Sequence, residues 1–317
     1  MSSQILIPTG GFTAKRELIT GDGWKHFILK LGDRYRHRPF NQIQYRLKGR
    51  AEIGFAHRDG VTRLSHLYQH DPVRILFPNP APGDSVEATV VTTSGGLVGG
   101  DKISLEITAD ANTTALVSAQ AAEKIYRSAG GVAEISVTIS ANKESWIEWL
   151  PQETILFDGS KLRRRTSINA VPGARVLAGE ILVLGRVGSG EQYSSGFLRD
   201  AWEVYRKDKL VWADALCLDD DIPGILSHPA CFDGATALAT AVYVCDDPAA
   251  HLEAAREMSS ADDKDVLSSA TVVNEVLVLR WLAKDAYSLR QSFAEFWKAF
   301  RHHAGDRPAE LPRLWYV

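Results

Sequence analysis

Two carboxylic acids in apolar and aromatic surroundings make residues 147–158 the segment best equipped for chemistry. They are Glu148 and Glu153. Paired carboxylates are the catalytic groups of glycosidases, which hold them about 5 or about 6.5–9.5 Å apart. The same acids can instead pair with the arginines at residues 163–165 or point to solvent. The sequence does not set the distance between them, so hydrolysis and ion pairing both stay open as interpretations.

Glycine is densest at residues 93–101, which end in Gly99, Gly100 and Asp101. A phosphate-binding loop needs Lys and then Ser or Thr after its last glycine, and the dinucleotide pattern GxGxxG is also missing. The carboxylate of Asp101 would repel a phosphate. Glycine pairs more often permit left-handed backbone or close approach of strands. We therefore expect a tight structural turn that presents Asp101.

Histidine offers only a weak metal-binding pattern. His66 and His70 are four residues apart, which on a helix would place both on one face. Pro72 follows, however, and the surrounding residues predict strand and turn. No Ser-His-Asp or Cys-His arrangement can be assembled from the sequence. The residues alone therefore indicate no catalytic machinery.

The elements that position these residues are predicted to be mostly strands. From residue 51 onward apolar and polar residues alternate, as around Ile103, Leu105 and Ile107, which is typical of a strand with one buried face. Further strands are predicted at residues 87–93, 115–119, 134–139, 146–150, 175–184, 201–205, 210–218 and 237–244. A polar hairpin turn is expected at residues 206–209. Strands at this density, without helices between them, favour stacked antiparallel layers over βαβ units.

Helices are predicted only near the C-terminus. Pro248 ahead of residues 249–258 suits a short helix with proline in its first turn. Residues 272–282 favour one buried strand. A longer helix is indicated by an apolar stripe at helical spacing, which we expect to pack on a sheet. The stripe consists of Leu289, Phe293, Phe296, Trp297 and Phe300.

Composition and charge exclude several classes of protein. With 45% hydrophobic and 24% charged residues over 317 positions, the chain has the make-up of a soluble globular protein. No signal peptide is apparent, and no apolar run reaches the roughly 18 residues of a membrane span. The cysteines form no CxxC pair, which fits a reducing compartment better than disulfides or zinc, so we expect a cytoplasmic location. They are Cys217, Cys231 and Cys245.

The charge is unevenly distributed and suggests two parts. Residues 1–50 carry ten Lys or Arg against three acids, a balance of +7, so the remainder carries −10 of the total −3. The basic segment has no nucleic-acid-binding motif and is typical of a solvated, partly disordered arm. We predict a basic N-terminal extension at residues 1–45 and a single domain at residues 46–317. The acidic body would favour cations over anions.

Several motifs, in order along the chain, resemble one family. Residues 94–101, 120–128 and 148–159 look like motifs of the UreD (UreH) urease accessory proteins, and residues 311–315 look like the family's C-terminal ending. The resemblance runs from about residue 50 to the C-terminus. It implies a mostly β fold, a layered β-helix-like stack of strands with a few α-helices toward the C-terminus.

The resemblance also implies a role in urease maturation without catalysis by this chain. Its implied partners are a helical UreF-type accessory protein, a UreG-type GTPase and the urease apoprotein, and neither nucleic acid nor a membrane. No cofactor is held tightly; Ni²⁺ passes through in transit. The GTP hydrolysis would belong to the partner, in keeping with the missing phosphate loop here.

Weakly binding acids suit an ion in transit, because Ni²⁺ is held more firmly by imidazole or thiolate than by carboxylate. Asp101 matches the family's glycine-loop acid, and Asp214 lies on the predicted strand 210–218. Glu123, Glu148 and Glu153 come from the motif segments. These five acids are the candidates for a transient nickel path. Two alternatives remain: a carbohydrate-active β-solenoid enzyme that uses Glu148 and Glu153, and a purely structural adaptor without a metal path.

Overall fold

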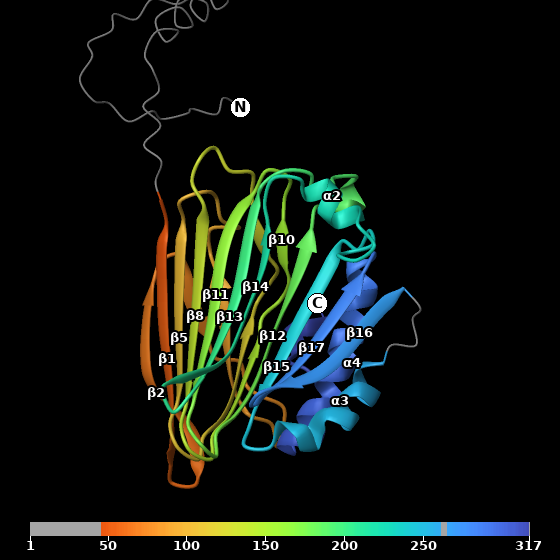
Figure 1. Ribbon diagram of the computed structural model, residues 1–317. Coiled ribbons are helices and arrows are strands. Elements are labelled where there is room, and N and C mark those ends of the chain that lie inside the picture. The colour runs from red at the N-terminus through yellow and green to blue at the C-terminus, as the bar shows by residue number, and fades with distance from the viewer. Residues whose placement is uncertain (1–45, 261–264, 317) are drawn as a thin grey trace, which may run out of the picture. The chain divides into compact units, whose positions relative to one another are not determined.

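Two large β-sheets dominate the computed structural model, which describes residues 46–260 and 265–316 (Figure 1). The predicted extension at residues 1–45 lies outside the described residues. From Arg46 on, the chain forms one compact unit.

The first sheet, sheet A, has seven strands in the order β14-β13-β11-β8-β5-β1-β2. In chain order, these strands are β1 (Lys48–Arg58), β2 (Val61–His70), β5 (Lys102–Ala109), β8 (Ala133–Ala141), β11 (Lys161–Ala170), β13 (Phe197–Arg206) and β14 (Lys209–Leu218).

The second sheet, sheet B, has the order β16-β17-β15-β12-β9-β6-β4-β3, with β7 and β10 off this path. In chain order, these strands are β3 (Val73–Leu76), β4 (Val86–Thr92), β6 (Thr114–Ala119), β7 (Glu123–Ile125), β9 (Trp146–Leu150), β10 (Thr154–Leu156), β12 (Arg175–Leu184), β15 (Ala237–Val244), β16 (Val266–Val273) and β17 (Val276–Ala283).

The central strands are parallel, because the chain alternates between the two sheets. It passes from β5 in sheet A to β6 in sheet B, then through β8, β9, β11, β12 and β13 in the same alternation. Each of these strands therefore lies beside the strand of the same sheet from the preceding turn of the chain and runs in the same direction. This solenoid-like stack confirms the predicted β-helix-like fold. The expectation of antiparallel layers was wrong for these strands, since neighbours along the chain do not pair within one sheet.

Antiparallel pairing remains toward the ends of the stack, in hairpins and where β15 lies between β12 and β17. Lys207 and Asp208, both with positive φ, form the predicted turn between β13 and β14. The single strand predicted at residues 272–282 was wrong. Asn274 adopts a φ of 51° and turns the chain, so this region is the β16–β17 hairpin.

The core between the sheets follows from alternation along the strands. On β5, Ile103, Leu105 and Ile107 are buried, whereas Lys102 and Glu106 are exposed. Val137 and Ile139 on β8 continue the buried rows. Each turn of the chain through the two sheets, which we call a rung, thus adds one layer of side chains to a continuous core.

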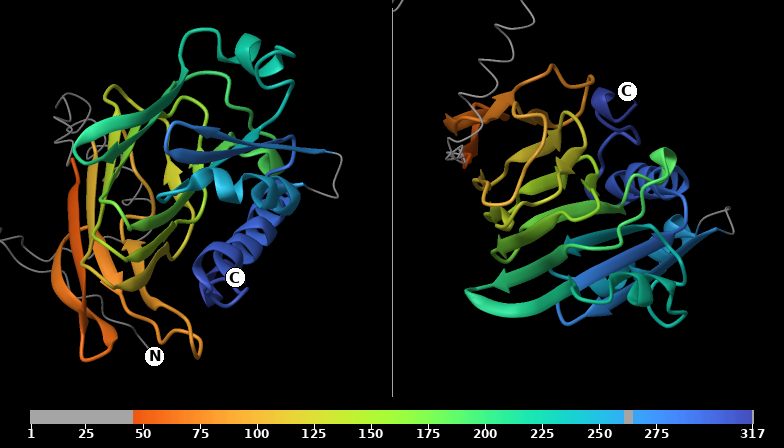
Figure 2. Two further views of the ribbon diagram at one scale, coloured as in Figure 1. Left: turned by 60° about the horizontal axis from the view of Figure 1, so that its bottom comes forward. Right: turned by 90° about the horizontal axis from the view of Figure 1, so that it is seen from above.

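A second core lies on the other face of sheet B, beneath the C-terminal helix α4 (Ala286–Gly305). All members of the predicted apolar stripe are buried here. Asp285 caps the helix by accepting a hydrogen bond from the Ser288 N–H at 2.7 Å. Figure 2 shows the central strands stacked in chain order, with α4 against one side of the stack.

The remaining helices are short. They are α2 (Ile222–Ser227), α3 (Leu252–Ser259) and the 3₁₀ turns η1 (Val187–Ser189), η2 (Pro248–His251) and η3 (Arg313–Tyr316). The helix predicted after Pro248 is thus η2 followed by α3. No helix in the described ranges is long and apolar enough to cross a membrane.

Candidate functional site

Three successive rungs of sheet B are interrupted at the same height. Residues 93–96 follow β4, residues 120–122 separate β6 from β7, and residues 151–153 separate β9 from β10. Pairing resumes beyond each interruption, where Leu97 bridges to Ile125 and β7 pairs with β10. The interruptions widen the space between the sheets into a cavity of about 180 Å³.

Local backbone chemistry explains two of the interruptions. Pro151 has no N–H to donate to the ladder. Gly96 has a φ of 145°, and a Cβ there would lie 2.7 Å from the Lys124 carbonyl oxygen. Only glycine fits this approach, so the glycine segment provides close packing of the rungs rather than a phosphate site.

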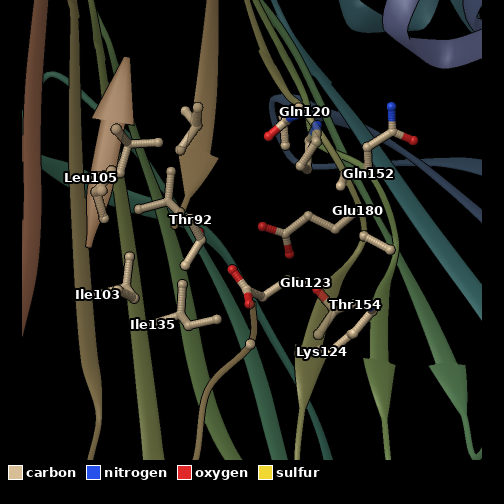
Figure 3. A pocket seen from close by; sticks show the side chains of 18 of the residues that line it. Thr92, Ile103, Leu105, Gln120, Glu123, Lys124, Ile135, Gln152, Thr154 and Glu180 are labelled. Atoms are coloured by element: carbon tan, nitrogen blue, oxygen red, sulfur yellow. The ribbon is translucent and has the colours of Figure 1, made fainter. Parts of the chain in front are cut away.

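The cavity has an apolar wall and a polar wall. Sheet A contributes Ile103, Leu105 and Ile135, whereas the opposite side carries Glu123 and Glu180. Figure 3 shows both carboxylates in the space between the sheets. Further polar side chains on the lining are Thr92, Gln120, Gln152, Thr154 and Arg164.

Glu123 is half-buried at the start of β7. Burial raises the pKa of its carboxyl group, although hydrogen bonds from the Thr92 hydroxyl and the Lys124 N–H oppose the rise. A carboxylate with few charged partners in a partly dry cavity is costly to ionise. A cation that entered the cavity would lower this cost.

Glu180 belongs to a buried network of three charged groups. Arg164 donates to both oxygens of Asp200, at 2.8 and 2.9 Å. Oε1 of Glu180 accepts from the Thr166 hydroxyl at 2.7 Å and from Trp149 Nε1 at 3.4 Å. Oε2 of Glu180 lies 3.0 Å from Arg164 Nε but accepts no hydrogen bond, because that N–H points at Asp200.

The network contains two carboxylates and one guanidinium, so full ionisation would leave an uncompensated buried negative charge. Burial raises the pKa of Glu180 to about 7; Arg164 opposes this rise and Asp200 adds to it. Glu180 therefore exchanges its proton near neutral pH.

The cavity is suited to weak, reversible binding of a cation. Its donors are oxygens, chiefly the two carboxylates and the Thr92 and Thr154 hydroxyls. Within residues 46–260 and 265–316, no three His, Cys, Asp or Glu side chains are grouped to hold a metal ion. A divalent ion would therefore keep part of its water shell and would be released readily.

Of the five acids proposed from the sequence, only Glu123 lines this cavity. Asp101 is buried in its turn, where its two oxygens accept from the N–H groups of Leu47 and Val98, each at 2.9 Å. Asp214 forms an ion pair with Arg280 on β17. A role of either acid in a nickel path stays a prediction.

Glu148 and Glu153 also have firm partners. Glu148 is fully buried in the second core, where Arg301, Trp146 and Trp297 donate to it. Glu153 pairs with Arg290. The arginine partners are thus on α4 and not in the run at residues 163–165.

Glu180 and its partners Arg164 and Asp200 are not among the site residues predicted from the sequence. A signal was present: Glu180 is the one acid within the apolar run of β12, and ionisable residues are rarely buried without a partner. Arg164 was hidden between Arg163 and Arg165, whose side chains point to solvent. Only the alternation of buried and exposed residues along β11 distinguishes Arg164 from its two neighbours.

The chain matches one family of known proteins over most of its length. The model of the family described as UreD urease accessory protein matches residues 47–316. A "Urease accessory protein UreD" of Magnetococcus marinus is 43% identical over 286 residues, covering 89% of this chain and 97% of that protein. Proteins of the same name from Azorhizobium caulinodans and Xanthobacter autotrophicus are 37% and 40% identical. They cover 85% and 86% of this chain, and 96% and 91% of their own lengths.

Proposed function

The chain belongs to the UreD family of urease accessory proteins, which serve urease maturation, and from this premise we propose that it passes nickel toward the urease apoprotein through its internal acidic cavity. The chain would act as a non-catalytic scaffold. Nickel is its cargo and not a resident cofactor.

The observation that carries this proposal is the pair of acids, Glu123 and Glu180, in a cavity between the sheets. Glu180 Oε2 is a buried oxygen that accepts no hydrogen bond from the described residues; it lies 3.0 Å from Arg164 Nε, so an entering cation would compete with Arg164 for it. Carboxylates hold Ni²⁺ less firmly than imidazole or thiolate. A conducting site must admit an ion and also release it, and oxygen donors meet this requirement.

We further propose that the chain works with a UreF-type accessory protein and a UreG-type GTPase. Membership of the urease accessory family supports an assembly with urease, and the two partners within it are our proposal. GTP hydrolysis is assigned to the partner, since the glycine segment here presents Asp101 and tight packing in place of a phosphate cradle.

The structure disfavours the carbohydrate-active alternative. Glu148 is fully buried beneath α4, so a glycan cannot reach it. The adaptor alternative differs from the proposal only in the cavity: it predicts that the cavity acids do not affect nickel transfer.

The test is nickel loading of urease by chains with Glu123→Gln, Glu180→Gln or both. Each change removes a charge and an oxygen ligand but keeps the size of the side chain. Losing one such contact costs about 1–3 kcal/mol, so we expect loading about tenfold slower or more, and slower still in the double variant. Nickel per urease is measured at matched yield of the co-purified complex.

Glu257→Gln, an exposed acid on α3, is the matched control and should load normally. Asp101→Asn and Asp214→Asn test two of the other four sequence-based candidates in the same assay. Normal loading by the Glu123→Gln, Glu180→Gln double variant would refute the cavity path and favour the adaptor.

A further inference from the structure

A band of positive charge crosses the outer face of sheet A. Its members are exposed side chains near the N-terminal ends of strands β1, β5, β11 and β13, which lie in one sheet with β8 (Figure 1). We call them the basic face: Lys48, Arg50, Lys102, Arg163, Arg165 and Arg199.

Strand register brings these side chains together. Lys48 pairs in register with Lys102, and Arg163 with Arg199. Glu134 on β8 stands between the two pairs. Because neighbouring strands are about 4.8 Å apart, the row forms one continuous surface. Arg50 and Arg165 lie two residues further along their strands and therefore on the same side.

The acids on this face do not neutralise it. Glu134 is held by Lys102 at 2.9 Å, and Arg50 is paired with Glu52 and Glu106. In the described part of the chain, no ion pair is formed by Lys48, Arg163, Arg165 or Arg199. The guanidinium of Arg163 instead lies over the Phe197 ring, 5.8 Å from its centre.

This arrangement has an energetic cost in the free protein. Like charges directly opposite on neighbouring strands destabilise a sheet, and Arg163 and Arg199 are such a pair. The two side chains border a shallow depression of about 690 Å³, together with Arg165 and Glu203. Carboxylates that entered the depression would remove the repulsion and could bind the guanidinium groups in a bidentate manner.

We propose that the basic face docks an acidic surface of a protein partner in the urease maturation assembly, an inference that rests on the proposed function. The chain's own first 45 residues carry seven Lys or Arg against three acids, so they do not complement this face. Glu134 and Glu203 lie among the cations and can accept hydrogen bonds from Lys, Arg, Ser or Thr side chains of a protein partner, which phosphate groups do not offer. The face also lacks the array of aromatic rings on which bases stack, so it fits a protein better than a nucleic acid.

The test is charge reversal by Arg163→Glu, Arg165→Glu and Arg199→Glu in the full chain. All three side chains are exposed, so the fold should survive. A version with Gln at the three positions removes the positive charges without adding negative ones, so it controls for repulsion caused by the new glutamates. The matched control reverses Lys143, Lys207 and Lys209, which are exposed outside this face. Binding to purified UreF-type protein and to purified urease apoprotein is measured by biolayer interferometry at 50 and 300 mM NaCl.

We expect reversal to weaken binding to one of these proteins at least tenfold and to reduce its salt dependence, with a smaller loss for the Gln version and a change below twofold for the control. Unchanged affinity and salt dependence with both partners would overturn the basic face as a docking surface while leaving the proposed function intact. A wild-type chain that binds neither partner would overturn both. Tight binding of a mixed-sequence RNA oligonucleotide that is lost on reversal would overturn the protein partner in favour of nucleic acid.

Discussion

At the scale of single residues, the structure assigns different roles to acids that look alike in sequence. Glu148 and Glu180 are both buried glutamates on strands of sheet B, yet they face opposite sides of it. Glu148 is bound by Arg301 and two indole N–H groups, whereas one oxygen of Glu180 accepts no hydrogen bond. The first therefore has a structural role, whereas the second is an acid that we propose for the nickel path.

The raised pKa of Glu180 predicts a pH-dependent stability. The group titrates at about 7 in the folded chain, against an ordinary value of 4.5 when exposed in the unfolded chain. The unfolded chain therefore loses this proton first as the pH rises. The stabilisation from the protonated group is complete below about pH 4.5 and is lost progressively up to about pH 7, at roughly 1–3 kcal/mol in total. The free energy of unfolding, obtained from urea titrations at pH 5, 6, 7 and 8, measures this loss.

Glu180→Gln should flatten this pH dependence, because the amide does not titrate. Glu257→Gln should leave it unchanged. Parallel pH profiles for wild type and Glu180→Gln would show that Glu180 ionises normally in the folded chain.

At the scale of elements, helix α4 is held to sheet B by one buried arginine as well as by its apolar stripe. Arg301 donates to Glu148 and to Asp84, and also to the carbonyl oxygens of Pro308 and Glu310. One side chain thus joins the helix to a central strand, to the loop before β4 and to the C-terminal segment. The helix cannot shift without breaking several charge-assisted hydrogen bonds at once.

Arg301→Met should therefore destabilise the fold strongly. It leaves Glu148 buried without its charged partner, for which a cost of about 3–5 kcal/mol is typical. Adding Glu148→Gln should recover part of the loss, because the remaining group is then neutral. Urea denaturation followed by tryptophan fluorescence reports the change, since Trp146 and Trp297 both donate to Glu148. A loss below 1 kcal/mol in the single variant would contradict this account.

At the scale of the whole molecule, the family match begins at residue 47 and the compact unit at Arg46. We therefore expect removal of residues 1–45 to preserve the fold and the binding of partners. The thermal unfolding midpoint of the truncated chain should remain within about 2 °C of that of the full chain, since the truncated chain keeps the whole compact unit that begins at Arg46. Calorimetry of both chains checks this. Loss of a cooperative transition on truncation would show that the extension is part of the domain.

The sequence by itself determined the local structure and the family of this protein. Alternation along the strands and the stripe of α4 were predicted correctly, because they depend on which residues a strand or helix buries on one side. The motifs at residues 94–101, 120–128 and 148–159 indicated the family without any knowledge of the fold.

Only the tertiary structure decided which strands pair and which acids meet. A period of two shows that a strand has two faces, but it does not say which sheet the strand joins. The parallel stack therefore could not be told from antiparallel layers. Glu123 and Glu180 are 57 positions apart, and they share a cavity because three rungs are interrupted at one height. Contacts between residues so far apart in the sequence depend on long-range packing, which cannot be deduced from a local pattern of residues.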